Sequence, residues 1–153
     1  MSNDENMINV NITTVTKSNS GHIYVDVERS ILNLEIINEK YNHDEFLVLC
    51  NALKQFLKQA CDNKLKYFLI FHTQKIGIYP LRCYEIIKKT LEEIKPQLTK
   101  VLHSTCVLVE PNFTSQILKF FFAIYKPVRP AIVITKLTEA EPFFEKNINT
   151  AEF

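Results

Sequence analysis

Residues 65–71 have the sequence LKYFLIF, a short run that is almost entirely apolar and rich in aromatic side chains. A run of this length and character is typical of a strand that lies inside a sheet and is covered on both faces. Two similar runs follow at residues 105–109 (TCVLV) and 131–135 (AIVIT). Segments with helical periodicity separate the three runs, which predicts parallel strands joined by helical crossovers.

Two long segments place apolar residues three and four positions apart, as helices with one buried face do. The first begins at Asn42 or His43 and ends at Asn63, which suits a left-handed cap. The second begins after Pro80. We expect Pro96 to kink or end it, because proline lacks the backbone N–H group that a helix interior needs.

Two further helices are predicted nearer the C-terminus. Residues 113–125 carry a broad apolar face, and prolines follow it. Residues 138–141 (TEAE) have the spacing of a capping box, which predicts the start of a last helix.

Two half-buried strands precede the helical units. Apolar and polar residues alternate over residues 22–28 and again over residues 31–38. Arg29 and Ser30 lie between them, which is the right length for a two-residue hairpin turn. Residues 8–12 alternate in the same way and suggest a short edge strand.

These elements predict one α/β domain over residues 21–146. Its sheet is mixed, with an N-terminal hairpin followed by βαβ units and with helices packed on the sheet. Residues 1–20 are rich in Asn, Ser and Thr and are predicted to be flexible, and so is the tail at residues 147–153. A length of 153 residues fits a single domain.

Composition excludes several classes of protein. The net charge is +1, which argues against a strongly basic nucleic-acid binder. No apolar run approaches the ~20 residues of a membrane span, and the first twenty residues do not resemble a secretory signal. We therefore expect a cytoplasmic protein. Gly21 and Gly77 are the two glycines, so a glycine-rich phosphate cradle is not available.

The reactive side chains form no recognisable catalytic or metal-binding motif. The four cysteines lack C-x2-C spacing and the four histidines lack the spacing of zinc ligands. We predict no catalytic residue, no metal site and no cofactor, and we expect the cysteines to be reduced packing residues. One alternative stays open. Cys83 near a helix start, or Cys106, could pair with His72 at a strand end, and the 72–82 loop could then form a small-ligand site or an active site.

Charge and aromatic residues suggest where a partner could bind. Residues 1–53 hold three basic and eight acidic residues (net −5), whereas residues 54–100 hold ten basic and four acidic (net +6). The helix predicted at residues 113–125 carries more aromatic side chains than one sheet-facing stripe can bury, and Phe120 is the residue left over. The candidate interaction surface combines the basic region with this aromatic residue: His72, Thr73, Lys75, Arg82, Lys88, Lys89 and Phe120.

Both ends of the predicted domain resemble a known family. The N-terminal hairpin (HIYVDVERSILNLEII) and the ending (VLVEPNFTSQILKFFFAIYKPVRPAIVITKLTEAEPFF) are similar to those of STAS domains, the fold of bacterial anti-sigma-factor antagonists. The resemblance spans about residues 22–146 and implies a non-enzymatic protein-protein interaction or regulatory module. Partner binding or self-association is then expected, without specific nucleic-acid recognition.

The chain departs from that family where its phosphorylation switch would lie. Antagonist STAS proteins carry an Asp-Ser-x-Gly-like run there, whereas this chain has FHTQKIGIYPLRCYE, in which Thr73 is the nearest hydroxyl. We therefore expect no phosphorylation switch. The C-terminal region also looks similar to the CRAL-TRIO lipid-carrier fold. That likeness, together with the lysine-rich middle segment, keeps open an alternative role at a lipid or an anionic membrane surface.

Overall fold

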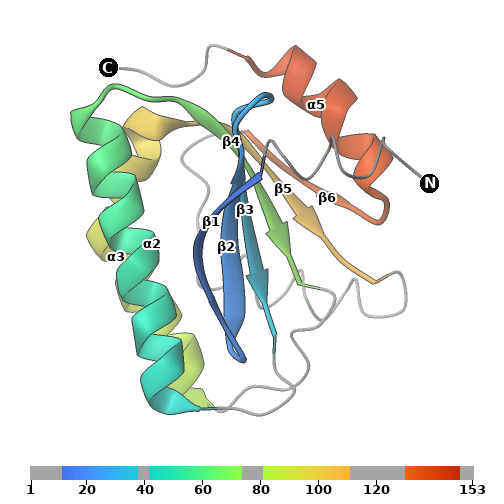
Figure 1. Ribbon diagram of the computed structural model, residues 1–153. Coiled ribbons are helices and arrows are strands. Elements are labelled where there is room, and N and C mark those ends of the chain that lie inside the picture. Colours follow the sequence, from blue (N-terminus) through green and yellow to red (C-terminus); the bar gives the residue numbers. More distant parts are fainter. Residues whose placement is uncertain (1–11, 38–41, 74–80, 111–129, 149–153) are drawn as a thin grey trace.

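The computed structural model describes residues 12–37, 42–73, 81–110 and 130–148 (Figure 1). Its centre is one six-stranded sheet whose strands lie in the order in which they occur along the chain. The strands are β1 (Ile12–Ser18), β2 (Gly21–Asp26), β3 (Ile31–Ile36), β4 (Tyr67–His72), β5 (Leu102–Leu108) and β6 (Ala131–Ile134).

The sheet is mixed, as predicted. β1, β2 and β3 form an antiparallel meander, and β3 to β6 are parallel to one another. The two long helices α2 (His43–Asp62) and α3 (Leu81–Val101) connect β3 to β4 and β4 to β5. The prediction of a single α/β domain with an N-terminal hairpin is therefore confirmed.

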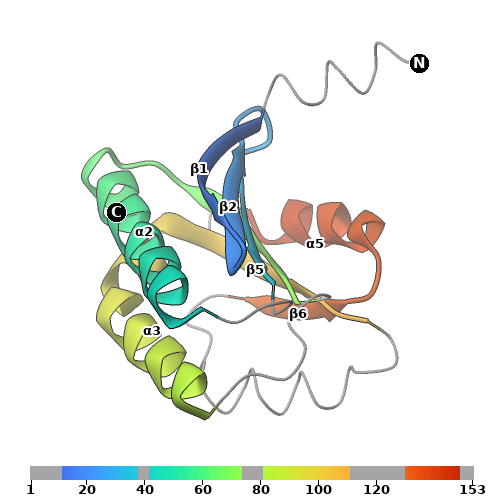
Figure 2. The same cartoon turned by 60° about the horizontal axis from the view of Figure 1, so that its bottom comes forward.

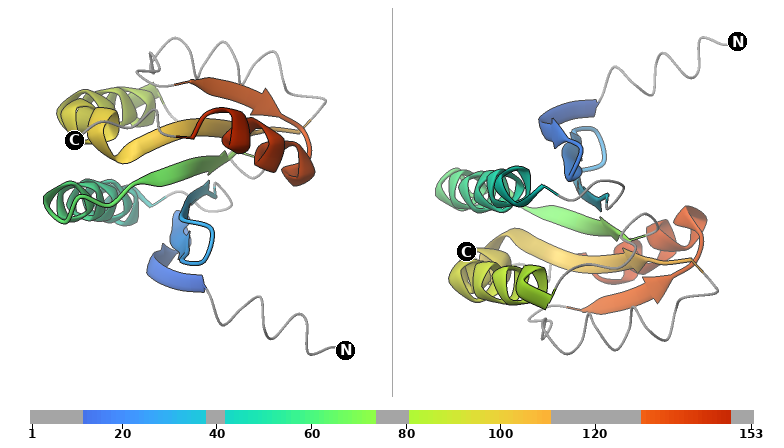
Figure 3. Two further views of the ribbon diagram at one scale, coloured as in Figure 1. Left: turned by 90° about the horizontal axis from the view of Figure 1, so that it is seen from above. Right: turned by 90° about the horizontal axis from the view of Figure 1, so that it is seen from below.

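Within the described residues, the two faces of the sheet are covered unequally. α2 and α3 lie side by side on one face, and the short η2 (Leu137–Glu139) leads into α5 (Ala140–Lys146) on the other (Figures 2 and 3). The larger core lies under α2 and α3 and includes Ile23, Leu57 and Ile94, each fully buried. A smaller core under α5 joins Phe144 to residues of β4, β5 and β6.

α2 begins where the sequence predicts it. The Asn42 side chain accepts a hydrogen bond from the Glu45 backbone N–H at 3.0 Å and so caps the helix. The predicted C-terminal cap was one residue early. Asn63 has φ −91°, and it is Lys64, with φ 56°, that adopts the left-handed conformation.

The N-terminal side differs from the prediction in two ways. The segment expected to be flexible contains β1, because the threonines of ITTVTKS are β-branched and suit a strand. The turn between β2 and β3 spans four residues instead of two, since Asp26 pairs with Ile31. The Asp26 carboxylate accepts the Arg29 N–H at 3.2 Å, and Ser30 has φ 56°, so the longer turn is locally stabilised.

Further differences lie in the second half. α3 continues through Pro96, because the buried residues Leu98 and Val101 extend its apolar stripe beyond the proline. β6 is a half-exposed edge strand rather than a fully buried one, with Ile132 exposed. Glu139 accepts the Lys136 N–H at 3.2 Å, so the cap forms two residues before the predicted box. The predicted strand at 8–12 and helix at 113–125 lie almost wholly outside the described residues.

Gly21 lets β2 approach α2 closely, which yields a test of this packing. A Cβ atom there would lie 2.6 Å from the Glu35 carbonyl oxygen and 2.7 Å from a Leu49 methyl carbon. We expect Gly21→Ala to lower the free energy of unfolding by about 1–3 kcal/mol in urea titration. Asn19→Ala, in the exposed neighbouring turn, should stay within about 0.5 kcal/mol. Equal stability of the two variants would contradict this packing.

Candidate functional site

A pocket of about 450 Å³ lies on the face of the sheet that carries α5. α5 packs over β4, β5 and β6 on that face, and the pocket extends from α5 toward β1, β2 and β3. Its volume is within the range of small-molecule sites. The lining combines apolar walls with a few polar groups: Ile12, Tyr24, Asp26, Arg29, Ile31, Asn33, Phe68, Ile70, His72, Leu137, Ala140, Glu141, Phe144, Glu145 and Ile148.

Three polar residues from adjacent strands form one part of the lining. Tyr24 on β2 is the register partner of Asn33 on β3. The His72 Nε2 atom donates a hydrogen bond to the Asn33 Oδ1 atom over 2.9 Å, since a carbonyl oxygen can only accept. Both side chains are buried, and the Tyr24 and His72 rings lie 6.3 Å apart. Asn33 and His72 are therefore polar groups that their mutual hydrogen bond holds in place.

This polar part of the pocket is uncharged at neutral pH. Burial lowers the pKa of His72 below its ordinary value of 6.5, and the nearby Glu35 carboxylate opposes the shift. Burial also raises the pKa of Tyr24, and Glu35 adds to that shift. The imidazole and the phenol are therefore both neutral. They can exchange hydrogen bonds with a ligand without carrying charge.

The rest of the lining is aromatic, aliphatic and acidic. Phe68 and Phe144 stack with their ring centroids 4.6 Å apart, which anchors α5 on β4. Leu137 and Ile148 line the pocket and are more than half exposed. The Arg29 Nε atom lies 4.0 Å from an Asp26 carboxylate oxygen, so the pocket's basic side chain is ion-paired.

The structure distributes the predicted interaction residues over different environments. His72 is 7% exposed and lines the pocket, and Thr73 is 4% exposed, with its hydroxyl donating to the Leu108 carbonyl at 2.8 Å. These two residues therefore offer little surface to a protein partner. Lys88 and Lys89 are exposed on α3. The remaining members, Lys75, Phe120 and the side chain of Arg82, lie outside the described residues.

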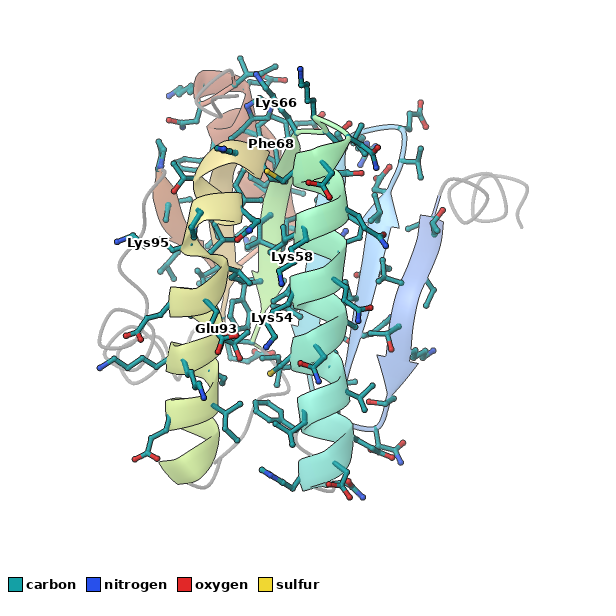
Figure 4. The ribbon with its side chains drawn as sticks, turned by 90° about the vertical axis from the view of Figure 1, so that its left-hand side faces the viewer. Lys54, Lys58, Lys66, Phe68, Glu93 and Lys95 are labelled. Carbon is teal, nitrogen blue, oxygen red and sulfur yellow. The ribbon has the colours of Figure 1, made fainter. Side chains whose placement is uncertain are left out.

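Lysines gather on the outer side of α2 and α3 (Figure 4). Lys54 Nζ lies 2.9 Å from a Glu93 carboxylate oxygen, which ties the two helices together. The hydrogen bond and charge of Lys54 lower the pKa of Glu93, and the charges of Lys89 and Lys58 lower it further. Lys54, Lys58 and Lys89 are thus close enough to Glu93 for their charges to act on its carboxylate.

The cysteines differ in burial. Burial raises the pKa of the Cys106 thiol to about 12, and Glu139 adds to the shift, so this residue packs as an apolar side chain. Cys50 and Cys61 are half-buried and form no disulfide among the described residues, whereas the Cys83 side chain lies outside them. Within the described ranges, no three His, Cys, Asp or Glu side chains are grouped as a metal site would need.

Sequence reasoning did not single out Tyr24 and Asn33. Both occupy the polar positions of alternating strands, which the pattern assigns to an exposed face. The available signal for the site was Asn33 in the middle of a strand, because asparagine is depleted in strands.

Comparison with known proteins adds no relative. No family model matches the chain, and no curated protein or solved structure matches it. The resemblance to STAS domains therefore stays a prediction. In the parts of the chain that the structure describes, no helix is both long enough and apolar enough to cross a membrane.

The lowered pKa of His72 predicts a pH dependence of stability. The unfolded state takes up a proton near pH 6.5, whereas folded His72 resists protonation until a lower pH. Stability should therefore fall as the pH drops below about 6.5. His72→Gln keeps a donor for Asn33 and removes the titrating group, so it should flatten that fall. His22→Gln should do so less, because His22 is more exposed and its own pKa is lowered by burial and Lys17.

Urea unfolding of the parent and the two variants at pH 5 and 7.5 measures this difference. An unchanged pH slope in His72→Gln would show that protonation of His72 is not coupled to folding.

Proposed function

We propose that this protein is a non-enzymatic binding module that holds a small, largely apolar ligand in the pocket beside α5. The observation that supports this most is the pocket itself, with about 450 Å³ of space and apolar walls around the polar groups of Tyr24, Asn33 and His72. Ligand sites commonly combine apolar walls with a few fixed polar groups that orient the ligand.

Binding fits the polar groups better than catalysis does. A general base needs a pKa near the working pH, whereas burial lowers that of His72. Its Nε2 atom is already committed to Asn33. No cysteine, serine, threonine or lysine is among the described residues that line the pocket, so these common nucleophiles are not available beside His72 there.

A regulatory role is compatible with such a site. In this proposal the protein is STAS-like in architecture and binds a protein partner or a second copy of itself without a phosphorylation switch. The buried, hydrogen-bonded hydroxyl of Thr73 supports the last point, since a kinase needs an accessible hydroxyl. A cytoplasmic location fits Cys50 and Cys61, which form no disulfide among the described residues.

Filling the pocket tests the proposal. Ile31 is half-buried and lines the pocket, so Ile31→Phe should occupy ligand space. A screen of small aromatic and aliphatic compounds by NMR should give hits that shift the amide signals of Tyr24, Asn33 and Ile70. We expect Ile31→Phe to weaken those hits about tenfold, because steric overlap costs roughly 1–3 kcal/mol.

Ile86→Phe is the matched control, because Ile86 is half-buried on α3, on the opposite face of the sheet. It should bind the same compounds as the parent does. The proposal fails if the compounds shift no pocket signal, or if they bind Ile31→Phe as tightly as the parent.

A second candidate function is contact with an anionic membrane surface through α2 and α3. The position of Lys54, Lys58 and Lys89 near Glu93, whose pKa all three lower, favours it. Basic residues near such a surface contribute about 1 kcal/mol each. Lys58→Glu combined with Lys89→Glu should therefore reduce co-sedimentation with phosphatidylserine vesicles by tenfold or more, roughly.

Lys146→Glu, on α5 across the sheet, is the control for that experiment and should sediment as the parent does. Equal sedimentation of the parent with phosphatidylserine and with phosphatidylcholine vesicles would rule the membrane role out.

A further inference from the structure

We infer that the ligand of this pocket is a small organic cation, with an apolar body and an amine or quaternary ammonium group that lies against the carboxylates of α5. The inference rests on the proposed function, because it concerns the same pocket. It adds the charge of the ligand, which the pocket's volume and apolar character do not determine.

The charged residues of the lining are mostly acidic. Asp26, Glu141 and Glu145 are acids, and Arg29 is the one base among the described lining residues. Arg29 is already paired with Asp26, through its side chain and through its backbone N–H. The charge that remains for a ligand is therefore that of the two glutamates.

Glu141 and Glu145 lie four residues apart on α5, which places them on the same side of the helix. Both are exposed, and neither has a hydrogen bond or an ion pair within the described residues. Glu139, the preceding acid, differs because it accepts from the Thr135 hydroxyl and the Lys136 N–H. Two carboxylates at the pocket are thus available to a cation.

The walls of the pocket suit the same kind of ligand. Tyr24, Phe68 and Phe144 all contribute aromatic rings to the lining. The face of an aromatic ring attracts a cation, and quaternary ammonium ligands are commonly held this way. The buried pair His72 and Asn33 adds fixed hydrogen-bonding atoms without adding positive charge that would repel the ligand.

An anionic ligand would meet the opposite conditions. It would approach two glutamates, and the nearest guanidinium is engaged by Asp26. Repulsion between the anionic ligand and the two glutamates lowers the affinity of the ligand, and this repulsion weakens as the salt concentration rises. A neutral ligand would keep the apolar contacts without any gain from Glu141 and Glu145. The three charge types therefore differ in predicted affinity.

Three probes of one shape separate these cases: 2-naphthylmethylammonium, 2-naphthylmethanol and 2-naphthoate. Each is titrated into the full chain at low salt and followed by NMR at the pocket signals. We expect the ammonium to bind about three- to tenfold more tightly than the alcohol, and the carboxylate to bind more weakly than the alcohol. Addition of about 0.5 M salt should remove most of the difference in affinity among the three probes.

The double variant Glu141→Gln with Glu145→Gln should lose the preference for the ammonium and keep its affinity for the alcohol. Glu92→Gln is the matched control, because Glu92 is an exposed acid on α3, on the other face of the sheet. It should retain the full preference.

The outcomes distinguish this inference from the proposed function. If the three probes bind equally, or the carboxylate binds most tightly, the pocket binds ligands but the inferred charge is wrong. Retention of the ammonium preference in the double variant also overturns the inference. If none of the three probes binds the parent, the proposed function fails together with it.

Discussion

The structure depends on the packing of two long helices against one face of a sheet whose central strands are parallel. Parallel strands need cover on both faces, because their side chains are apolar on both. On the first face, α2 and α3 supply it through residues such as Phe46, Leu57 and Ile94, which are almost completely buried. On the second face, the described cover is the seven-residue α5, which packs on β4, β5 and β6. This unequal cover determines where the pocket lies.

The strand pattern is adapted to the unequal cover. β4 and β5 are largely buried on both faces, and Phe144 of α5 belongs to one core with Phe68 and Cys106. β2 and β3 alternate instead, with apolar residues toward the helices and Tyr24, Asn33 and Glu35 toward the second face. The pocket lies where these two kinds of strand meet, at the boundary between apolar and polar surface. Its mixed lining is therefore a consequence of the fold.

How much of the fold could be predicted from the sequence depends on the same burial of the strands. Burial on both faces makes apolar runs distinct in sequence, so β4 and β5 could be located from residues 65–71 and 105–109. β1 was missed because its threonines carry little hydrophobic contrast, although their branching suits a strand. The prediction for Pro96 considered only the local cost of a proline inside a helix. In the structure α3 continues, because the burial of Leu98 outweighs that cost.

The pocket could not be predicted in the same way, because it depends on distant parts of the chain. Asn33 and His72 are 39 residues apart and meet only through the parallel pairing of β3 with β4. The glutamates of α5 come from beyond β6, and nothing in their local pattern separates them from solvated acids. His72 was singled out as a strand-end residue. The sequence offered no indication that its partner would be an asparagine on β3.

The Asn33–His72 pair links the fold to the proposed function. A buried hydrogen bond between neutral groups contributes only about 1 kcal/mol net, and two apolar side chains of similar shape would serve stability nearly as well. Stability alone therefore gives no reason for a polar pair at this point of the sheet. The ligand proposed for the pocket gives such a reason, because fixed hydrogen-bonding atoms orient a bound molecule at little entropic cost. The proposed function thus gives this pair a role that the packing of the sheet does not require.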